Sequence, residues 1–406
     1  MKTIITIAWR NLWRNKLRTS VIIISIILGL WGSMFLMGLM QGMNDSRISS
    51  AIDTYLSHVQ IHNKEFREDP VLENYIHDLS DLMSRLDESP LIKAYSPRIL
   101  IDAMVSTSKG SYGARLIGVI PEKEKNVSLI PSKLNEGSYL NKYKKPSIVI
   151  GNKLAEKLGV KLKSKVKFSF QNEQGDILSY SFRVEGIYKI SNSMLEKVDV
   201  FIKQEDLEKI LGTQHRIHEV GILLNDIQDV KKAKAEFQQW DGQNKVEMWD
   251  EVSPELGYAQ EMMATFSYIF MGIILIALAF AIINTMLMAV LERQRELGIM
   301  MAVGFNKLKL FLMIVFETIF LAVIATPIGM WISYQSIEYF GKHGLHFLSV
   351  SEGLEYFGMG SSIYTQLDGK YYVVIAFMTL LTTFIAALFP AKRALNTEPI
   401  KAIRDV

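Results

Sequence analysis

Four stretches of the chain consist almost entirely of apolar residues, and charged residues bound each of them. They are residues 19–44, 262–291, 310–337 and 371–391. A helix of about 20 apolar residues is long enough to cross a hydrocarbon core roughly 30 Å thick. Because backbone amides inside lipid must find hydrogen bonds within their own segment, we predict a transmembrane helix at each stretch.

The first stretch has a second interpretation, as part of a cleaved signal peptide, because a basic segment from Arg10 to Arg18 precedes it. It is longer than the apolar region of a signal peptide, however, and residues 40–44 at its end form a poor cleavage site. We therefore expect it to remain as an anchor.

The region between the first two stretches, residues 45–261, is long enough to bury a core of its own. Runs of β-branched and aromatic residues with partial period-two alternation predict strands at 98–107, 114–120, 147–151, 166–170, 177–187, 200–202 and 220–224. Helical spacing predicts helices at 71–86, 152–158, 204–211 and 230–240. The sequence thus predicts a mixed α+β domain with two lobes, joined to the membrane by a helical stalk of residues 45–55 and 253–263.

The composition excludes several classes of protein. The net charge of +3 over 406 residues is too small for a nucleic-acid-binding protein. The absence of cysteine rules out disulfides, thiolate metal sites and cysteine nucleophiles. The sequence has no phosphate-binding loop of the form G-x-x-x-x-G-K-[ST] and no recognisable catalytic constellation of Ser, His and Asp. We expect no catalytic residue, no metal and no cofactor bound by this chain itself.

Basic residues gather at one end of each apolar stretch, in the flank 1–18, the loop 292–309 and the tail 392–406. They are Lys2, Arg10, Arg14, Lys16, Arg18, Arg293, Arg295, Lys307, Lys309, Lys392, Arg393, Lys401 and Arg404. Four crossings put all of them on one side, which the positive-inside rule makes the cytoplasm, with both termini. Residues 45–261 and the loop 338–370 then lie outside. The flank interleaves tryptophans with arginines, which predicts a short helix in the membrane interface.

Two pairs of histidines are weak candidates for metal ligands. His58 and His62 are four residues apart, but the β-branched residues between them favour an extended chain over a helix. His215 and His218 are a weaker pair still. We expect a metal at neither pair.

The loop 292–309 begins with charged residues, continues with apolar ones and contains two glycines. A solvated connector is one interpretation, but the apolar centre favours a helix on the membrane surface. We expect Leu297, Ile299 and Met300 or Met301 to press into a partner.

Glu317 lies about two turns into the third apolar stretch. A carboxylate at that depth is costly unless it is paired or hydrated. We expect it to pair with Arg293, Arg295 or a basic residue of the N-terminal flank, rather than to transfer protons.

The segments 292–304, 389–394 and 398–402, together with Glu317, resemble the FtsX-like permease domain of ABC transporters, here residues 262–406. The segment 8–19 also resembles that superfamily. The segment 150–160 resembles the MacB-type periplasmic core domain, here inserted between the first two membrane helices. Within this superfamily, three segments are most similar to the LolC/LolE lipoprotein-releasing branch. They are residues 42–43, 58–62 and 351–355.

The resemblance implies an inner-membrane permease that extracts lipoproteins for a soluble periplasmic carrier. ATP and Mg²⁺ are then bound by two copies of a separate ATPase, and a second permease chain, identical or related, completes the transporter. The resemblance also implies that the Glu292 to Gly304 segment couples to the ATPase and passes motion through the second helix to the outer domain. The coupling residues would be Glu292, Arg293, Gln294, Arg295, Glu296, Leu297, Gly298 and Gly304. Methionines of the first two helices could line a cavity for acyl chains, with packing between helices as the alternative. They are Met34, Met37, Met40, Met43, Met262, Met263 and Met271.

Other functions stay open at this stage. A MacB-like exporter of peptides, toxins or antibiotics with a detached ATPase is the nearest alternative. An FtsX-like transmitter that activates a cell-wall hydrolase is a second, although its outer domain is smaller. A membrane-anchored enzyme is disfavoured by the missing catalytic constellation. The residues alone select neither the substrate nor the carrier-recruiting residues.

Overall fold

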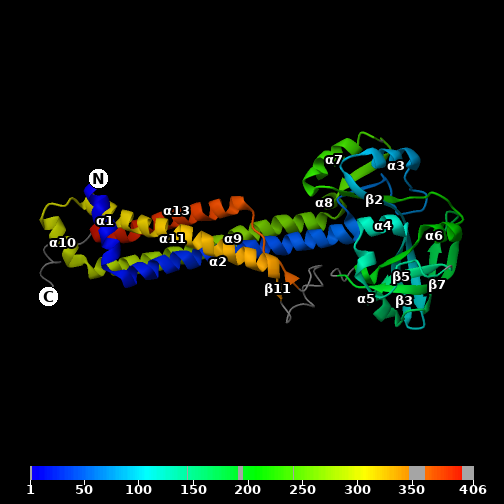
Figure 1. The fold of residues 1–406 in the computed structure, drawn as a ribbon, viewed down its shortest axis with the longest axis horizontal. Coiled ribbons are helices and arrows are strands. Elements are labelled where there is room, and N and C mark those ends of the chain that lie inside the picture. The colour runs from blue at the N-terminus through cyan, green and yellow to red at the C-terminus, as the bar shows by residue number, and fades with distance from the viewer. Residues whose placement is uncertain (1, 144, 191–194, 241, 347–361, 396–406) are drawn as a thin grey trace. The chain divides into compact units, whose positions relative to one another are not determined.

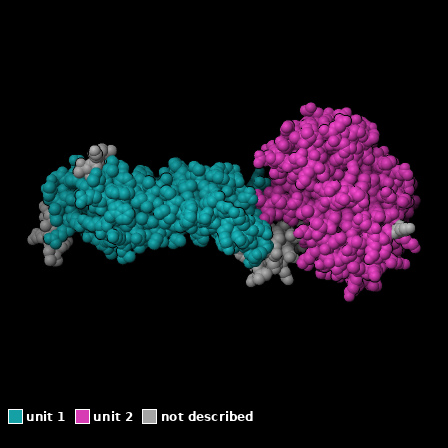
Figure 2. Space-filling model, in the orientation of Figure 1, with its two compact units in different colours: residues 1–44, 260–346, 362–406 teal, residues 45–259, 347–361 magenta. Residues whose placement is uncertain are grey.

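A computed structural model describes residues 2–143, 145–190, 195–240, 242–346 and 362–395. The chain divides into two compact units, which Figure 2 shows in different colours. Unit 1 consists of residues 1–44, 260–346 and 362–406, and unit 2 of residues 45–259 and 347–361. Two segments that carried the family resemblance, 351–355 and 398–402, lie outside the described residues.

Unit 1 is helical. Its elements are α1 (Lys2–Arg14), α2 (Lys16–Ala51), α9 (Pro254–Glu292), α10 (Gln294–Ala302), α11 (Lys307–His343), α13 (Gly369–Leu395) and a short pair of strands, β11 (Leu345–His346) and β12 (Ser362–Ile363). Among the described residues, four helices are long and apolar enough to cross a bilayer, namely α2, α9, α11 and α13. Each of the four predicted stretches lies inside one of them.

The helices are longer than the apolar runs that predicted them. Helix α2 continues to Ala51 and is followed by a π-helical turn, Ile52–Leu56, while α9 already begins at Pro254. Most of the predicted stalk is therefore helical, although residues 253 and 52–55 are not α-helix. Apolar composition marks the part of a helix that meets lipid, whereas the backbone hydrogen bonds continue into the polar flanks.

Helix α1 buries a stripe of residues four apart, Ile4, Ala8 and Leu12. It lies across the end of unit 1 at which α10 is found (Figure 1). On one side it packs against α11, where the Trp9 ring meets the Phe320 ring edge-on, with centroids 5.6 Å apart. The predicted helix of the N-terminal flank is thus present, and it is tied to the bundle.

Two glycines let α2 approach the segment before α13 at backbone distance. The Gln366 N–H donates to the Gly38 carbonyl at 3.0 Å. A Cβ atom on Gly42 would lie 1.8 Å from the Tyr364 carbonyl oxygen, so only glycine fits there. The side chain of Gln41 adds a hydrogen bond to Asp368 at 3.0 Å.

Unit 2 is an α+β domain. Its strands are β1 (Val59–Asn63), β2 (Ile92–Thr107), β3 (Gly110–Val119), β4 (Leu134–Gly137), β5 (Ser147–Gly151), β6 (Lys165–Gln171), β7 (Ile177–Tyr188), β8 (Asp199–Lys203), β9 (Glu219–Leu224) and β10 (Asn244–Met248). Its helices are α3 (Leu79–Glu88), α4 (Pro121–Val127), α5 (Asn152–Leu158), α6 (Gln204–Leu211), α7 (Val230–Phe237) and α8 (Trp249–Val252). The predicted fold class is therefore confirmed.

Strand β2 belongs to two parts of this domain. Its first half pairs with β9 and continues the order β10-β1-β9-β2. The pairs β2-β3, β3-β8, β8-β5, β5-β7, β7-β6 and β6-β2 close a ring of strands. The two predicted lobes thus share a strand and do not form separate sheets.

The predicted helices α5 and α6 begin and end where expected, because Gly159 and Gly212 adopt the left-handed conformation that closes a helix. The prediction of a helix over 71–86 was wrong in its first half, since α3 begins only at Leu79. The Ile76 N–H donates instead to the Ile217 carbonyl, a partner far along the chain. Local periodicity contains no information about such a partner.

Candidate functional site

Helix α10 follows α9 after a single residue, Arg293. It ends before Gly304, which has a φ of +101° and needs the conformational freedom of glycine. The predicted helix in the loop 292–309 is therefore present. Ile299 and Val303 are 47% and 81% exposed, so α10 and the turn after it present apolar side chains to the surroundings.

The prediction that Leu297 presses into a partner was wrong. Leu297 is 2% exposed and belongs to the apolar core of unit 1, beside Met313 and Ile314 of α11. Gly298 is buried with it. A helix turns one face inward, and this one turns Leu297 to the bundle and Ile299 away from it.

An ion cluster joins α10 to three other helices of unit 1. It consists of Arg14, Arg18, Arg293, Glu296 and Glu317. Arg18 donates to Glu317 at 2.8 Å, and Arg293 lies 3.4 Å from the same carboxylate. Glu296 pairs with Arg14 and, at 3.1 Å, with Arg293. Because Arg293 contacts both carboxylates, it links α10 directly to α11.

The two carboxylates of the ion cluster differ in burial. The Glu317 side chain is 3% exposed, and its partners Arg18 and Arg293 are also largely buried. Removing one partner of such a pair leaves a charge without compensation. Glu296 is half-exposed, and its hydrogen bond from Arg14, with a second one from Arg293, lowers its pKa below the usual value.

Sequence reasoning named Arg293 and the N-terminal flank as partners of Glu317, and the structure pairs Glu317 with Arg293 and Arg18. Arg295, the third predicted partner, is exposed and forms none of the ion pairs that the structure describes with Glu317. Glu292 and Gln294 are exposed as well. Helix α10 therefore combines an exposed polar start with an exposed apolar end.

The methionines predicted to line an acyl-chain cavity are packed in different ways. Met34, Met37 and Met271 are buried in the apolar core of unit 1. Met40 is half-buried and its sulfur accepts a hydrogen bond from Ser267, while Met263 is also half-buried. Packing between helices accounts for the buried three, and the cavity stays a prediction.

Three of these histidines, His58, His62 and His218, have side-chain partners within the protein. The His62 ring bonds Glu247 at 2.8 Å, and His58 accepts from the Leu224 N–H at 2.9 Å. His218 accepts from the Leu100 N–H, and burial lowers its pKa to about 4. Across the residues that the structure describes, no group of three or more His, Asp or Glu side chains is arranged to hold a metal ion.

Sequence reasoning missed a group of charged residues inside unit 2 that surrounds a cavity, with Arg98, Asp199 and Glu219 among its lining residues. A signal was present in the sequence, because single charged residues such as Arg98 and Asp199 stand next to apolar residues in the predicted strands or beside them. The partners come from strands far apart in the chain, so the signal could not show that they meet.

Family models match segments of both units. Residues 19–240 match the MacB-like periplasmic core domain, which is more than half of the chain, and residues 268–399 match the FtsX-like permease C-terminal family. A lipoprotein-releasing system transmembrane protein LolC of Xylella fastidiosa is 22% identical, over 81% of this chain and 82% of that protein.

An uncharacterised ABC transporter permease of Methanocaldococcus jannaschii is 23% identical, over 99% of this chain and 97% of its own length. Among solved structures, the periplasmic region of MacB from Actinobacillus actinomycetemcomitans aligns with 51% of this chain and 95% of its own, at 13% identity and a TM-score of 0.35.

Proposed function

The chain belongs to the family of ABC transporter permeases that carry a MacB-like periplasmic core domain and an FtsX-like permease domain, and from this premise we propose that it extracts lipoproteins from the membrane. Lipoprotein extraction is supported by the relatives named for lipoprotein release, which match over most of the chain. The energy comes from ATP bound with Mg²⁺ to a separate ATPase subunit, present in two copies beside a pair of permease chains.

Helix α10 is the observation that carries the ATPase part of the proposal. It offers an apolar contact surface, Ile299 and Val303, next to exposed charged residues at its start. An exposed apolar patch with a polar rim is typical of a protein-binding site. The ATPase therefore docks on α10 and the turn after it, through Ile299, which the sequence had also predicted, and through Val303 instead of Leu297.

The ion cluster gives a route for motion away from α10. Arg293 holds Glu296 of α10 and Glu317 of α11 at once, and Arg18 holds Glu317 from α2. Arg293 directly precedes α10, so a displacement that moves Arg293 must either carry α11 with it or separate Arg293 from the buried Glu317. Breaking such a buried pair costs several kcal/mol, on the order of 3 to 5. Movement of the helices together is the lower-energy response.

The basic residues around α10 and at both ends of the chain support a cytoplasmic location for this side of unit 1. Unit 2 then lies on the outer side, where a lipoprotein and a soluble carrier are accessible. Both termini are cytoplasmic in this arrangement.

The experiment is a release assay with the full chain. The permease is reconstituted in vesicles with its second permease chain, its ATPase and a triacylated lipoprotein, and receives ATP with or without a carrier. We expect ATP-dependent transfer to the carrier, reduced at least tenfold by Ile299→Asp combined with Val303→Asp. Ile177→Asp, at a 78% exposed position of unit 2, is the matched control.

The substrate and the coupling are tested separately. Robust ATP hydrolysis without lipoprotein release, together with ATP-dependent export of a peptide or antibiotic, would show that the substrate is the exported molecule and not a lipoprotein. Lipoprotein release that is unaffected by the α10 variants would agree with a lipoprotein substrate but would reject α10 as the docking element for the ATPase.

A further inference from the structure

Three neighbouring strands of unit 2 present alternate residues to opposite faces. One face, with Ile99, Leu116 and Val200, is buried in the main apolar core. The opposite face, by the period of two, carries Arg98, Leu100, Asp102, Arg115, Ile117, Asp199 and Phe201. The register places Asp102 beside Arg115 and Arg115 beside Asp199, so charged residues form a row across β2, β3 and β8.

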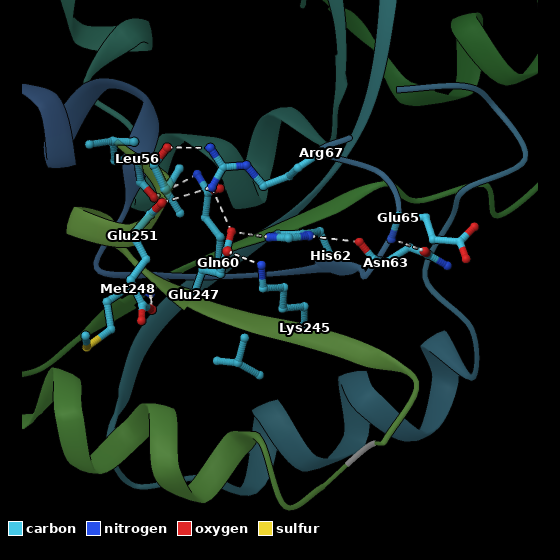
Figure 3. A network of polar contacts seen from close by, with 12 residues as sticks. Leu56, Gln60, His62, Asn63, Glu65, Arg67, Lys245, Glu247, Met248 and Glu251 are labelled. Atoms are coloured by element: carbon cyan, nitrogen blue, oxygen red, sulfur yellow. Dashed lines mark hydrogen bonds and ion pairs between the residues drawn. The ribbon is translucent and has the colours of Figure 1, made fainter. Parts of the chain in front are cut away.

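This second face lines a cavity of about 340 Å³, which we name the Asp199 pocket. Its other walls include Gln60, His62 and Arg67. Figure 3 shows how the carboxylate of Glu247 holds that wall, bonding His62 at 2.8 Å and Arg67 at 2.7 Å. The wall is therefore fixed by hydrogen bonds and is already formed without an occupant.

Glu247 itself is not available to an occupant. Burial alone would raise its pKa, but hydrogen bonds from His62, Lys245 and Arg67 lower the pKa well below the usual value. Its charge is thus balanced by its own neighbours.

Arg98 is equally occupied by protein partners. Its guanidinium donates to both oxygens of Glu124, at 3.0 and 3.1 Å, to Glu219 at 2.7 Å and to the Tyr55 carbonyl at 3.0 Å. It has little capacity left for a bound anion. Arg98 therefore does not make the Asp199 pocket an anion site.

Asp199 differs from Glu247 and Arg98 because its side chain has no such hydrogen-bond partners in the part of the chain that the structure describes. It is 7% exposed and lines the cavity, yet no hydrogen-bond donor among the described residues reaches its carboxylate. Burial raises its pKa to about 7, against the opposing attraction of Arg115 and Arg98 and with added repulsion from Glu219 and Asp102. A carboxylate that lines a cavity and has no donor from the described residues is open to a donor from an occupant.

We propose that the Asp199 pocket binds a small organic cation, a primary ammonium group on an apolar stem. The ammonium donates to Asp199, and the stem lies against Leu100, Ile117 and Phe201, which line the same cavity. The volume is at the lower end of that found for small-ligand sites, so the ligand is small. This binding is independent of lipoprotein release and adds a ligand site to the outer domain.

The test uses the full chain in nanodiscs and the probe 4-fluorophenethylamine, followed by fluorine NMR. We expect saturable binding that weakens at least tenfold in Asp199→Asn, a substitution of the same shape. Asp176→Asn, at an exposed position outside the cavity lining, is the matched control and should bind as the unsubstituted chain does. Leu100→Trp fills the cavity while keeping the carboxylate, and should also abolish binding.

The pH dependence gives a second readout. With a carboxyl pKa of about 7, roughly one tenth of Asp199 is ionised at pH 6 and roughly nine tenths at pH 8, so affinity should rise nearly tenfold over that range. The neutral 4-fluorophenylethanol should bind weakly and independently of pH. Equal binding of the amine by Asp199→Asn and the unsubstituted chain, or stronger binding of 4-fluorophenylpropanoate than of the amine, would overturn the proposal.

Discussion

At the scale of single residues, buried carboxylates show how the surroundings decide the behaviour of one chemical group. Glu124 is fully buried and accepts two hydrogen bonds from Arg98. Asp199 is nearly as buried and accepts none from the described donors. The sequence predicted neither environment, because each depends on strands that meet only in the folded domain.

Replacing Asp199 by asparagine should stabilise the protein, and the gain should grow with pH. The folded protein raises the pKa of Asp199 from 3.8 to about 7, so between these values the native state holds a proton that the unfolded chain has lost. The free energy of unfolding therefore falls as pH rises, a loss that asparagine does not suffer.

Between pH 5 and pH 8 the gain from Asp199→Asn should increase by roughly 2 to 3 kcal/mol. Thermal unfolding of the full chain, followed by circular dichroism at several pH values, measures it. Asp176→Asn serves as the exposed control, with little change at any pH. A gain that is constant from pH 5 to pH 8 would show that Asp199 ionises normally in the folded state.

At the scale of elements, the sequence predicted those helix boundaries that depend only on neighbouring residues. Helices α5 and α6 were predicted to the residue because a glycine closes each. The burial of Leu297 was not, since periodicity defines an apolar stripe without showing what the stripe faces. Glu317 needed a partner wherever it lay, but the choice of Arg18 over Arg295 depends on how α2 and α11 pack.

The contact between α2 and the segment 364–366 should not tolerate a methyl group at Gly42. A Cβ there meets the Tyr364 carbonyl at 1.8 Å, and two backbones must separate to make room. We expect Gly42→Ala to destabilise the full chain by about 1 to 3 kcal/mol, as overpacking does. Hydrogen exchange at the Gln366 N–H, which donates to Gly38, should become faster.

Gly32→Ala is the matched control in the same helix, because a Cβ at Gly32 meets no atom within 4 Å. Removing a mid-helix glycine there should be neutral or stabilising by about 0.5 to 1 kcal/mol. Similar melting temperatures for the two variants, measured in nanodiscs, would show that the close approach at Gly42 is not maintained.

At the scale of the whole molecule, the order of apolar runs and the mixed domain between the first two predicted the architecture, and the family comparisons confirm the resemblance. The proposed function depends on contacts with other chains. A single sequence contains only one of the two surfaces that form each contact. The docking proposal rests on two exposed apolar residues, Ile299 of α10 and Val303 of the turn after it.

The most direct test of this account is whether the ATPase covers α10. The chain has no cysteine, so Val303→Cys and, as a control in unit 2, Ile177→Cys each introduce a single thiol. Labelling by a maleimide is measured in nanodiscs with and without the ATPase subunit. We predict that the ATPase slows labelling at position 303 at least fivefold and leaves position 177 unchanged. Equal labelling at position 303 with and without a bound ATPase would contradict the account.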